Sequence, residues 1–226
     1  MVNFSYEEQT DMVQIFYECK KNSRHSVAAY REQYPDRRKP SHMTFKSILW
    51  TDESKFMTNG ILNRHNAHYW TDENPHWMRE SKFQTFHGVN VWCGIIGDQL
   101  IGPYFYSGTL TAQKYLEFLQ NTLPILLENV LLATRQHLYF QQDGCPAHNA
   151  YLIRHYLNEM FPGKWIGTHS SIPWPLRSPD LTCLDYFLWG YLKNKVYLTS
   201  PRDIMELKER IITECKNIPP EVIKEA

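Results

Sequence analysis

Two aspartates lie where the neighbouring residues predict burial or a sheet edge. Asp52 falls in an alternating stretch in which Trp50 and Phe56 would share its strand face. Asp143 ends the expected strand 138–142, so it would stand at the carboxyl end of a strand, where sites in open α/β sheets gather. A buried carboxylate is costly without compensation, so something positive should lie near Asp52.

A third aspartate, Asp185, follows Leu184 directly and Leu181 by four residues, so it would border the apolar stripe of a helix. Three acids on three elements could meet at one point. Oxygen ligands without a His or Cys pair suit Mg²⁺ or Mn²⁺. Two such ions can activate a water or a 3′-hydroxyl and stabilise the leaving oxygen in phosphodiester displacement. The predicted chemistry is therefore metal-dependent cleavage or transfer of phosphodiesters.

Each aspartate taken alone also has a purely structural interpretation. Asp52 could be a surface acid near a turn, and Asp143 could open an Asp-Gly turn. Asp185 could be an acid on an exposed helix face. Residue types and spacing leave these alternatives open.

Three sequence blocks resemble the signature blocks of mariner-type DNA transposases and occur in the same order. They are WTDESKF at 50–56, QQDGCPAH at 141–148 and SPDLTCLDYFLWG at 178–190. Each block contributes one metal-binding acid in that family. Matching residue by residue implies that Asp52, Asp143 and Asp185 are both the catalytic acids and the metal ligands. Asp180 matches a family aspartate that opens the helix, so we interpret it as an N-cap.

Further segments extend the resemblance to about residues 46–216. They are 63–70, 72–77, 89–95 and 189–193. The spacing between Asp143 and Asp185 leaves 41 residues between them (185 − 143 − 1), longer than in the best-known mariner branches. It resembles an insect-abundant side branch whose third acid is Asp. Cys183 stands where that family usually has proline.

The resemblance implies a fold, a reaction and partners. The expected fold is a ribonuclease H-like α/β mixed sheet flanked by helices, after a small N-terminal all-α helix-turn-helix remnant. The expected reaction is strand cleavage and transfer at transposon ends with two Mg²⁺ (or Mn²⁺) ions. DNA with terminal inverted repeats is the expected partner, a homodimer the expected assembly, the nucleus the expected location, and no membrane is expected.

Several basic residues are candidate DNA contacts, since phosphate binding needs only exposed positive charge. They are Arg37, Arg38, Lys39, Lys55, Arg64 and His148. The alternatives are an ordinary solvated turn at 37–39, plain surface charges at Lys55 and Arg64, and a surface histidine at a helix N-terminus for His148.

Three regions are expected around these candidates. Residues 1–45 would form the helix-turn-helix remnant, with helices at about 5–21 and 24–33 and the start of a third at 40. Residues 46–198 would form the catalytic core, and 199–226 would hold a C-terminal helix. Relative to the family, the chain is expected to be shortened at both ends, with an abrupt joint at 45–46.

Within the core, strands and turn dipeptides should come first. Hairpins are expected around Asn59-Gly60 and Gly97-Asp98. A helix from about 111 should kink or split at Pro124. Strands at 137–143 and 164–169 should flank a helix at 147–160, and the last helix should run over about 201–216.

Composition limits the class of protein but does not choose its activity. The 226 residues carry no net charge and no apolar run long enough for a membrane helix. The five cysteines are scattered without a C-x-x-C pair, which indicates neither a disulfide framework nor a thiolate zinc site. We therefore expect a globular intracellular protein with reduced thiols.

Three rival hypotheses remain open. The chain could be a captured transposase fragment, without catalytic activity, that binds DNA or a partner. It could be an unrelated nuclease of the same fold, although that would require another order of blocks. It could also be a gene-model artefact that joins two exons of a decayed element at 45–46. Loss of transposition through the shortened ends is expected even if the acids are retained.

Overall fold

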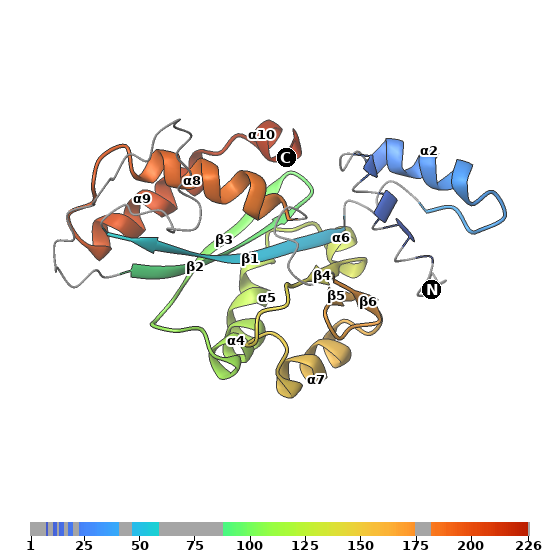
Figure 1. Cartoon of the computed structure of the whole chain (residues 1–226), viewed down its shortest axis with the longest axis horizontal. Coiled ribbons are helices and arrows are strands. Elements are labelled where there is room, and N and C mark those ends of the chain that lie inside the picture. The colour runs from blue at the N-terminus through green and yellow to red at the C-terminus, as the bar shows by residue number, and fades with distance from the viewer. Residues whose placement is uncertain are drawn as a thin grey trace, which may run out of the picture.

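A six-stranded mixed sheet lies between two layers of helices in this computed structural model (Figure 1). The structure describes residues 23–40, 47–58, 88–174 and 182–225, and residues 8, 11, 12, 14, 15, 18 and 19. The strand order is β3-β2-β1-β4-β5-β6. The strands are β1 (Ile48–Met57), β2 (Gly88–Ile96), β3 (Gln99–Tyr106), β4 (Tyr139–Gln141), β5 (Trp165–Gly167) and β6 (Ile172–Pro173).

The first three strands are antiparallel, and the remaining strands run parallel to β1. Asp52 pairs with Cys93 of β2, while Leu49 pairs with Phe140 of β4. Gly97 adopts a φ of 62° in the tight turn between β2 and β3, a conformation that glycine takes at little cost. The predicted hairpin at Gly97-Asp98 is thus confirmed, whereas the one at 59–60 lies outside the described residues.

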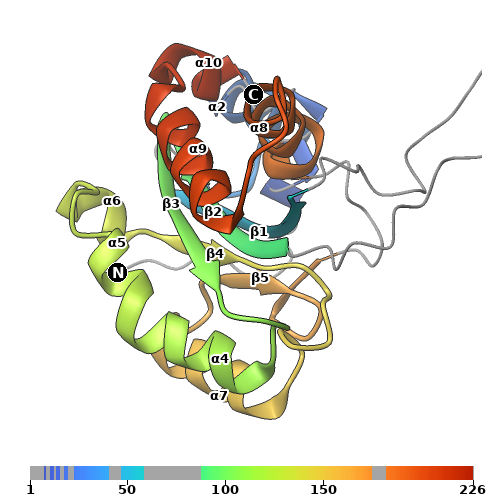
Figure 2. The ribbon, with the colours of Figure 1, turned by 90° about the vertical axis from the view of Figure 1, so that its left-hand side faces the viewer.

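One face of the sheet is covered by the helices that follow β3 and β4 (Figure 2). They are α4 (Ala112–Glu117), the π-helical turn η2 (Phe118–Thr122), α5 (Leu123–Leu126), α6 (Leu132–Gln136) and α7 (Tyr151–Met160). Pro124 lies in the first turn of α5, directly after the π-helical turn, so the predicted split of this helix is confirmed. The layer buries Trp92, Phe140 and Leu157 against the sheet.

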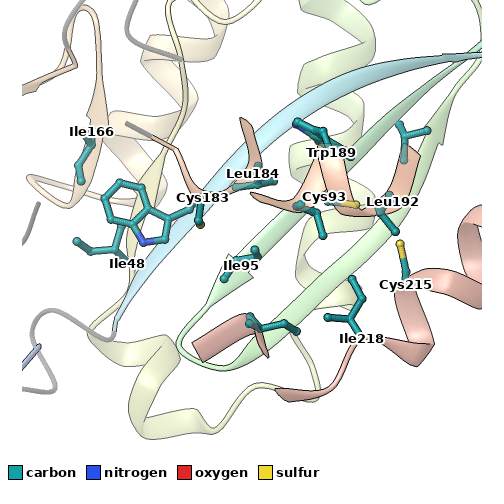
Figure 3. Close-up of a cluster of buried hydrophobic side chains, with 14 of the residues drawn as sticks. Ile48, Cys93, Ile95, Ile166, Cys183, Leu184, Trp189, Leu192, Cys215 and Ile218 are labelled. Carbon is teal, nitrogen blue, oxygen red and sulfur yellow. The ribbon is translucent and has the colours of Figure 1, made fainter. Parts of the chain in front are cut away.

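The opposite face is covered by the C-terminal helices. They are the π-helical turn η4 (Leu184–Leu188), α8 (Trp189–Val196), α9 (Ile204–Asn217) and α10 (Pro220–Glu225). Figure 3 shows Leu184, Trp189 and Leu192 lying over Cys93 and Ile95 of β2. The Trp189 ring also lies 6.2 Å from that of Phe56 on β1, so the segment that carries the third aspartate packs against the strand that carries the first.

The N-terminal region adds helix α2 (Ser23–Gln33). Met12, Ile15, Val27 and Tyr30 are buried and belong to the same apolar cluster as Ile48 of β1. The described residues between 8 and 18 are helical, as predicted for 5–21. The third helix predicted from 40 falls on residues outside the described part.

Four local expectations differ from the structure. Helix α10 (Pro220–Glu225) follows the helix that was expected to be the last. Helix α7 begins at Tyr151 instead of 147, because turns occupy 146–149. Strand β6 was not predicted, since its Pro173 reads as a breaker, yet an edge strand tolerates proline. Helix α6 was also not predicted. In the described residues, no helix is both long and apolar enough to cross a membrane.

Candidate metal centre

Asp52 lies in the middle of β1 on the face that the C-terminal helices cover. Its neighbours Trp50 and Phe56 are buried in the same cluster, which confirms the predicted apolar face. The indole Nε1–H of Trp189 donates a hydrogen bond of 2.6 Å to Asp52 Oδ2. One oxygen of this half-buried carboxylate is therefore held by a rigid donor from α8.

The pKa of Asp52 is raised well above that of an ordinary aspartate. Burial is the main cause, and the negative charges of Asp185 and then Glu53 add to it. The charge of Asp143 acts in the same direction, while the Trp189 hydrogen bond opposes them. Asp185 and Asp143 thus lie close enough to Asp52 to disfavour its ionisation.

Asp143 follows β4 by two residues, at the strand end where it was predicted. The backbone N–H of Cys145 donates to its Oδ1 at 3.0 Å, and His148 Nδ1 lies 2.6 Å from the same oxygen. Burial opposes the charge of Asp143, but the His148 hydrogen bond and charge outweigh it, so its pKa is lowered. This aspartate is held as a carboxylate at neutral pH.

Two hydrogen bonds tie the strands of Asp52 and Asp143 together. The Thr51 backbone N–H donates to Gln141 Oε1 at 2.9 Å, and the Thr51 hydroxyl donates to the Gln141 carbonyl at 2.6 Å. Both residues are buried. Because each bond joins neighbours of the two aspartates, the spacing of the first two acids is built into the sheet.

Asp185 lies in the first turn of η4, and its side chain is exposed. The hydroxyl of Thr182 donates to its Oδ2 at 2.8 Å. Lys193 of α8 has a lowered pKa, because the effect of burial outweighs the charges of Asp185 and Asp52, which raise it. Asp185 therefore lies at the solvent-exposed edge of this group, and Asp52 and Lys193 lie further inside.

The sequence did not predict that Glu53 belongs to this group or that His148 is buried in it. His148 is 1% exposed, with its ring 4.2 Å from that of Tyr115 and Nε2 3.4 Å from Glu53 Oε1. Burial lowers the pKa of His148, but Glu53 and Asp143 together raise it well above the ordinary value. The prediction of a surface histidine is thus wrong, and the His148 ring is not available on the surface for a phosphate.

A signal for both residues exists in the sequence. Glu53 directly follows Asp52, so the two must point to opposite faces of β1. A strand in the middle of a sheet is covered on both faces, which makes Glu53 a second, partly buried acid in need of a partner. His148, in the loop after β4, supplies that partner.

The other DNA-contact candidates remain predictions. Lys55, Arg38 and Lys39 are exposed, whereas Arg37 forms an ion pair with Asp11 and lies 4.3 Å over the Tyr34 ring. Arg64 and the N-cap candidate Asp180 lie outside the described residues.

The raised pKa of Asp52 predicts the effect of Asp52→Asn on the metal-free protein. A folded-state pKa above the unfolded value makes the fold less stable as pH rises from the unfolded pKa through the folded one. Asparagine removes this charge and still offers an acceptor to Trp189. We expect Asp52→Asn to raise the free energy of unfolding at pH 7 by about 1 kcal/mol, as relief of a strained site commonly does.

Urea unfolding in EDTA across a pH series measures this effect. The gain should disappear below the ordinary aspartate pKa, where both proteins are neutral at this position. Glu128→Gln removes an exposed charge and serves as the control. A gain that is independent of pH, or shared by the control, would contradict the explanation.

Comparisons with known proteins agree with this architecture. A family model described as a helix-turn-helix domain (DUF4817) matches residues 5–63, which confirms the predicted N-terminal helix-turn-helix. The comparison with curated protein sequences found no match.

Several solved structures of one transposase share the fold. The catalytic domain of the Mos1 mariner transposase matches with a TM-score of 0.60 and 16% identity, over 99% of this chain and 88% of that one. A Mos1 paired-end complex with the left transposon end matches with a TM-score of 0.62 and 15% identity, over 99% of this chain and 59% of that one. A mariner Mos1 paired-end complex with Mg matches with a TM-score of 0.63 and 18% identity, over 99% of this chain and 58% of that one.

This chain therefore spans 59% and 58% of the transposase chains in those two paired-end complexes. Identities this low show the fold alone. The mixed six-stranded sheet flanked by helices matches the Mos1 catalytic domain, and the predicted ribonuclease H-like fold class is confirmed.

Proposed function

We propose that this chain is a transposase-like protein whose Asp52, Asp143 and Asp185 bind two Mg²⁺ or Mn²⁺ ions and cleave and transfer DNA strands. The observation that carries the proposal is the charge crowding at Asp52. Its ionised form is disfavoured by burial and by Asp185 and Asp143, residues from distant parts of the chain. A divalent cation among them would supply the missing positive charge.

The oxygen ligands around Asp52 are of the type that a hard divalent cation prefers, although the ligand atoms that lie within 4.8 Å of one another in the described residues belong to Asp143, Cys145 and His148. The negative charges of Asp185, Glu53 and Asp143 all act on Asp52. Lys193 and His148 are cations that interact with these acids. Because His148 already serves Glu53 and Asp143, the Asp52–Asp185 pair keeps an excess of negative charge that oxygen-preferring cations would balance.

One oxygen of each aspartate is engaged by a protein donor. Trp189 holds Asp52 Oδ2, the Cys145 N–H and His148 hold Asp143 Oδ1, and Thr182 holds Asp185 Oδ2. Donors of this kind orient first-sphere ligands before the metal binds. Each carboxylate is therefore prepared to present its second oxygen in a fixed direction.

The bound divalent cations would activate the attacking water or 3′-hydroxyl and stabilise the leaving oxygen. The protein's own part is positioning. The β1–β4 hydrogen bonds fix Asp52 against Asp143, and the packing of η4 on β2 fixes the height of Asp185. Lys193 lies beside Asp185 and Asp52, where a lysine could attract a phosphate.

The proposed partner is DNA. The helix-turn-helix match at 5–63 is a type of motif that binds DNA, and the similar Mos1 chain is held in a complex with a transposon end. We propose that this chain binds transposon-end DNA, works in the nucleus and pairs as a homodimer. The insect-type branch with three aspartates is part of the same proposal.

Nicking of supercoiled plasmid DNA by the purified chain tests the proposal. We expect Mn²⁺ to support nicking and EDTA or Ca²⁺ to prevent it, because Ca²⁺ takes a looser, higher-coordinate geometry. DNA binding without any metal-dependent nicking would contradict the proposal and favour the rival, a DNA-binding fragment that no longer cuts.

A further inference from the structure

Asp143, Cys145 and His148 form a second ligand group beside the three aspartates. One ligand atom from each residue lies within 4.8 Å of those of the other two. The three occupy a D-x-C-x-x-H segment in the turns between β4 and α7. The set mixes a carboxylate, a thiol and an imidazole, which suits borderline and soft cations better than Mg²⁺.

The histidine of this group is already oriented as a metal ligand would be. Its Nδ1 lies 2.6 Å from Asp143 Oδ1, and its Nε2 lies 3.4 Å from Glu53 Oε1. A metal-binding histidine almost always directs its other ring nitrogen to a carboxylate or carbonyl. Glu53 is in that position, so Nδ1 is the nitrogen that faces the shared point.

The ring cannot easily leave this orientation. It is 1% exposed and packs against the Tyr115 ring. Its Nε2 and Glu53 Oε1 are both buried without a well-formed hydrogen bond. Cys145 and Asp143, in contrast, reach the surface, with 40% of the Asp143 side chain exposed. A cation would therefore rest on a buried nitrogen and still be open to solvent on its other side.

We propose that Asp143, Cys145 and His148 bind one divalent cation of the zinc class, with water at the fourth position. Zinc commonly takes three protein ligands in this way when a site is open. Binding removes the proton from the Cys145 thiol and from His148 Nδ1, and both protons pass to solvent. The absence of a C-x-x-C pair, which argued against a thiolate zinc site, does not exclude this mixed set.

Sharing of Asp143 gives the second site a regulatory consequence, which rests on the proposed function. A zinc-class cation held by Asp143 would withdraw this carboxylate from the Mg²⁺ ligands. Zinc should then inhibit DNA nicking in competition with Mn²⁺. Cys145→Ser should relieve the inhibition by zinc.

Cobalt is the probe for the site itself, because a Co²⁺–thiolate bond absorbs in the near ultraviolet. We expect the full chain to develop this band with one equivalent of Co²⁺ and to lose it on adding Zn²⁺. Cys145→Ser and His148→Gln should each abolish or weaken it at least about 10-fold in affinity. Cys19→Ser, which removes a partly buried cysteine elsewhere, should leave it unchanged.

The variants separate this proposal from the nuclease proposal. Asp52→Asn should lose nicking and keep the cobalt band, because Asp52 belongs to the aspartate centre alone. A band that persists in Cys145→Ser, or its absence from the wild-type chain, overturns the second site. Since His148→Gln could disturb the fold, its circular dichroism spectrum is compared with that of the wild type, and Cys145→Ser decides if they differ.

Discussion

Asp143→Asn is expected to reduce Mn²⁺-dependent nicking of supercoiled DNA by at least about 10²–10³-fold, the scale at which loss of one electrostatic contact to a reacting phosphate is felt. The substitution keeps the size of the side chain and an oxygen that can accept from the Cys145 N–H. What disappears is the negative charge that the His148 contact keeps in place. The two proposed cations lose one of their three anionic ligands.

The fold should tolerate this change. The side chain is 40% exposed and lies in the turns after β4 instead of in the core. A matched control is Asp98→Asn, an exposed aspartate in the β2–β3 turn. Nicking by Asp143→Asn at the rate of the control would remove Asp143 from the mechanism.

Trp92→Ala is expected to lower the free energy of unfolding by about 3–5 kcal/mol, the usual cost of truncating a buried tryptophan. Trp92 is 0% exposed on β2, and its ring lies 4.7 Å from that of Phe118 in the π-helical turn. It is also the register partner of Glu53 on β1. The cavity would open between β2 and the α4 layer, next to the strand that carries Asp52.

Urea unfolding of the two proteins measures this loss. Tyr151→Ala removes an aromatic ring that is 73% exposed on α7 and should change the free energy of unfolding by less than about 0.5 kcal/mol. A loss for Trp92→Ala no larger than that of Tyr151→Ala would show that the α4 layer does not depend on this ring.

The central strands were predictable because their chemistry is local. The alternation around Asp52 identifies β1 and its buried face, and Gly97-Asp98 identifies the β2–β3 turn. The segment Leu138-Tyr139-Phe140 before Asp143 identifies β4 and places the aspartate just after its end. In each case a short pattern determines both the element and the direction in which its acid points.

The environment of His148 was not predictable in the same way. A histidine near a helix start after an Asp-Gly turn looks solvent-exposed, yet Glu53 from a distant strand and Tyr115 from α4 enclose it. The late start of α7 has the same origin, because the turns at 146–149 place His148 against Asp143. Tertiary contacts here override the local preference.

The proximity of Asp185 to Asp52 also depends on packing that a linear pattern does not contain. The sequence places Asp185 on a helix margin, but only the seating of Leu184 and Leu188 on the sheet decides which strand lies beneath. The π-helical form of that turn left no visible sign in the sequence.

The third aspartate and the indole that holds the first one belong to a single helical segment, Asp185 in η4 and Trp189 at the start of α8. A shift of this segment by the length of one hydrogen bond would take both away from Asp52 together. The sheet would still hold Asp52 and Asp143 at their built-in spacing. Assembly of the proposed cation-binding group therefore depends on one event, the docking of the helical segment formed by η4 and α8.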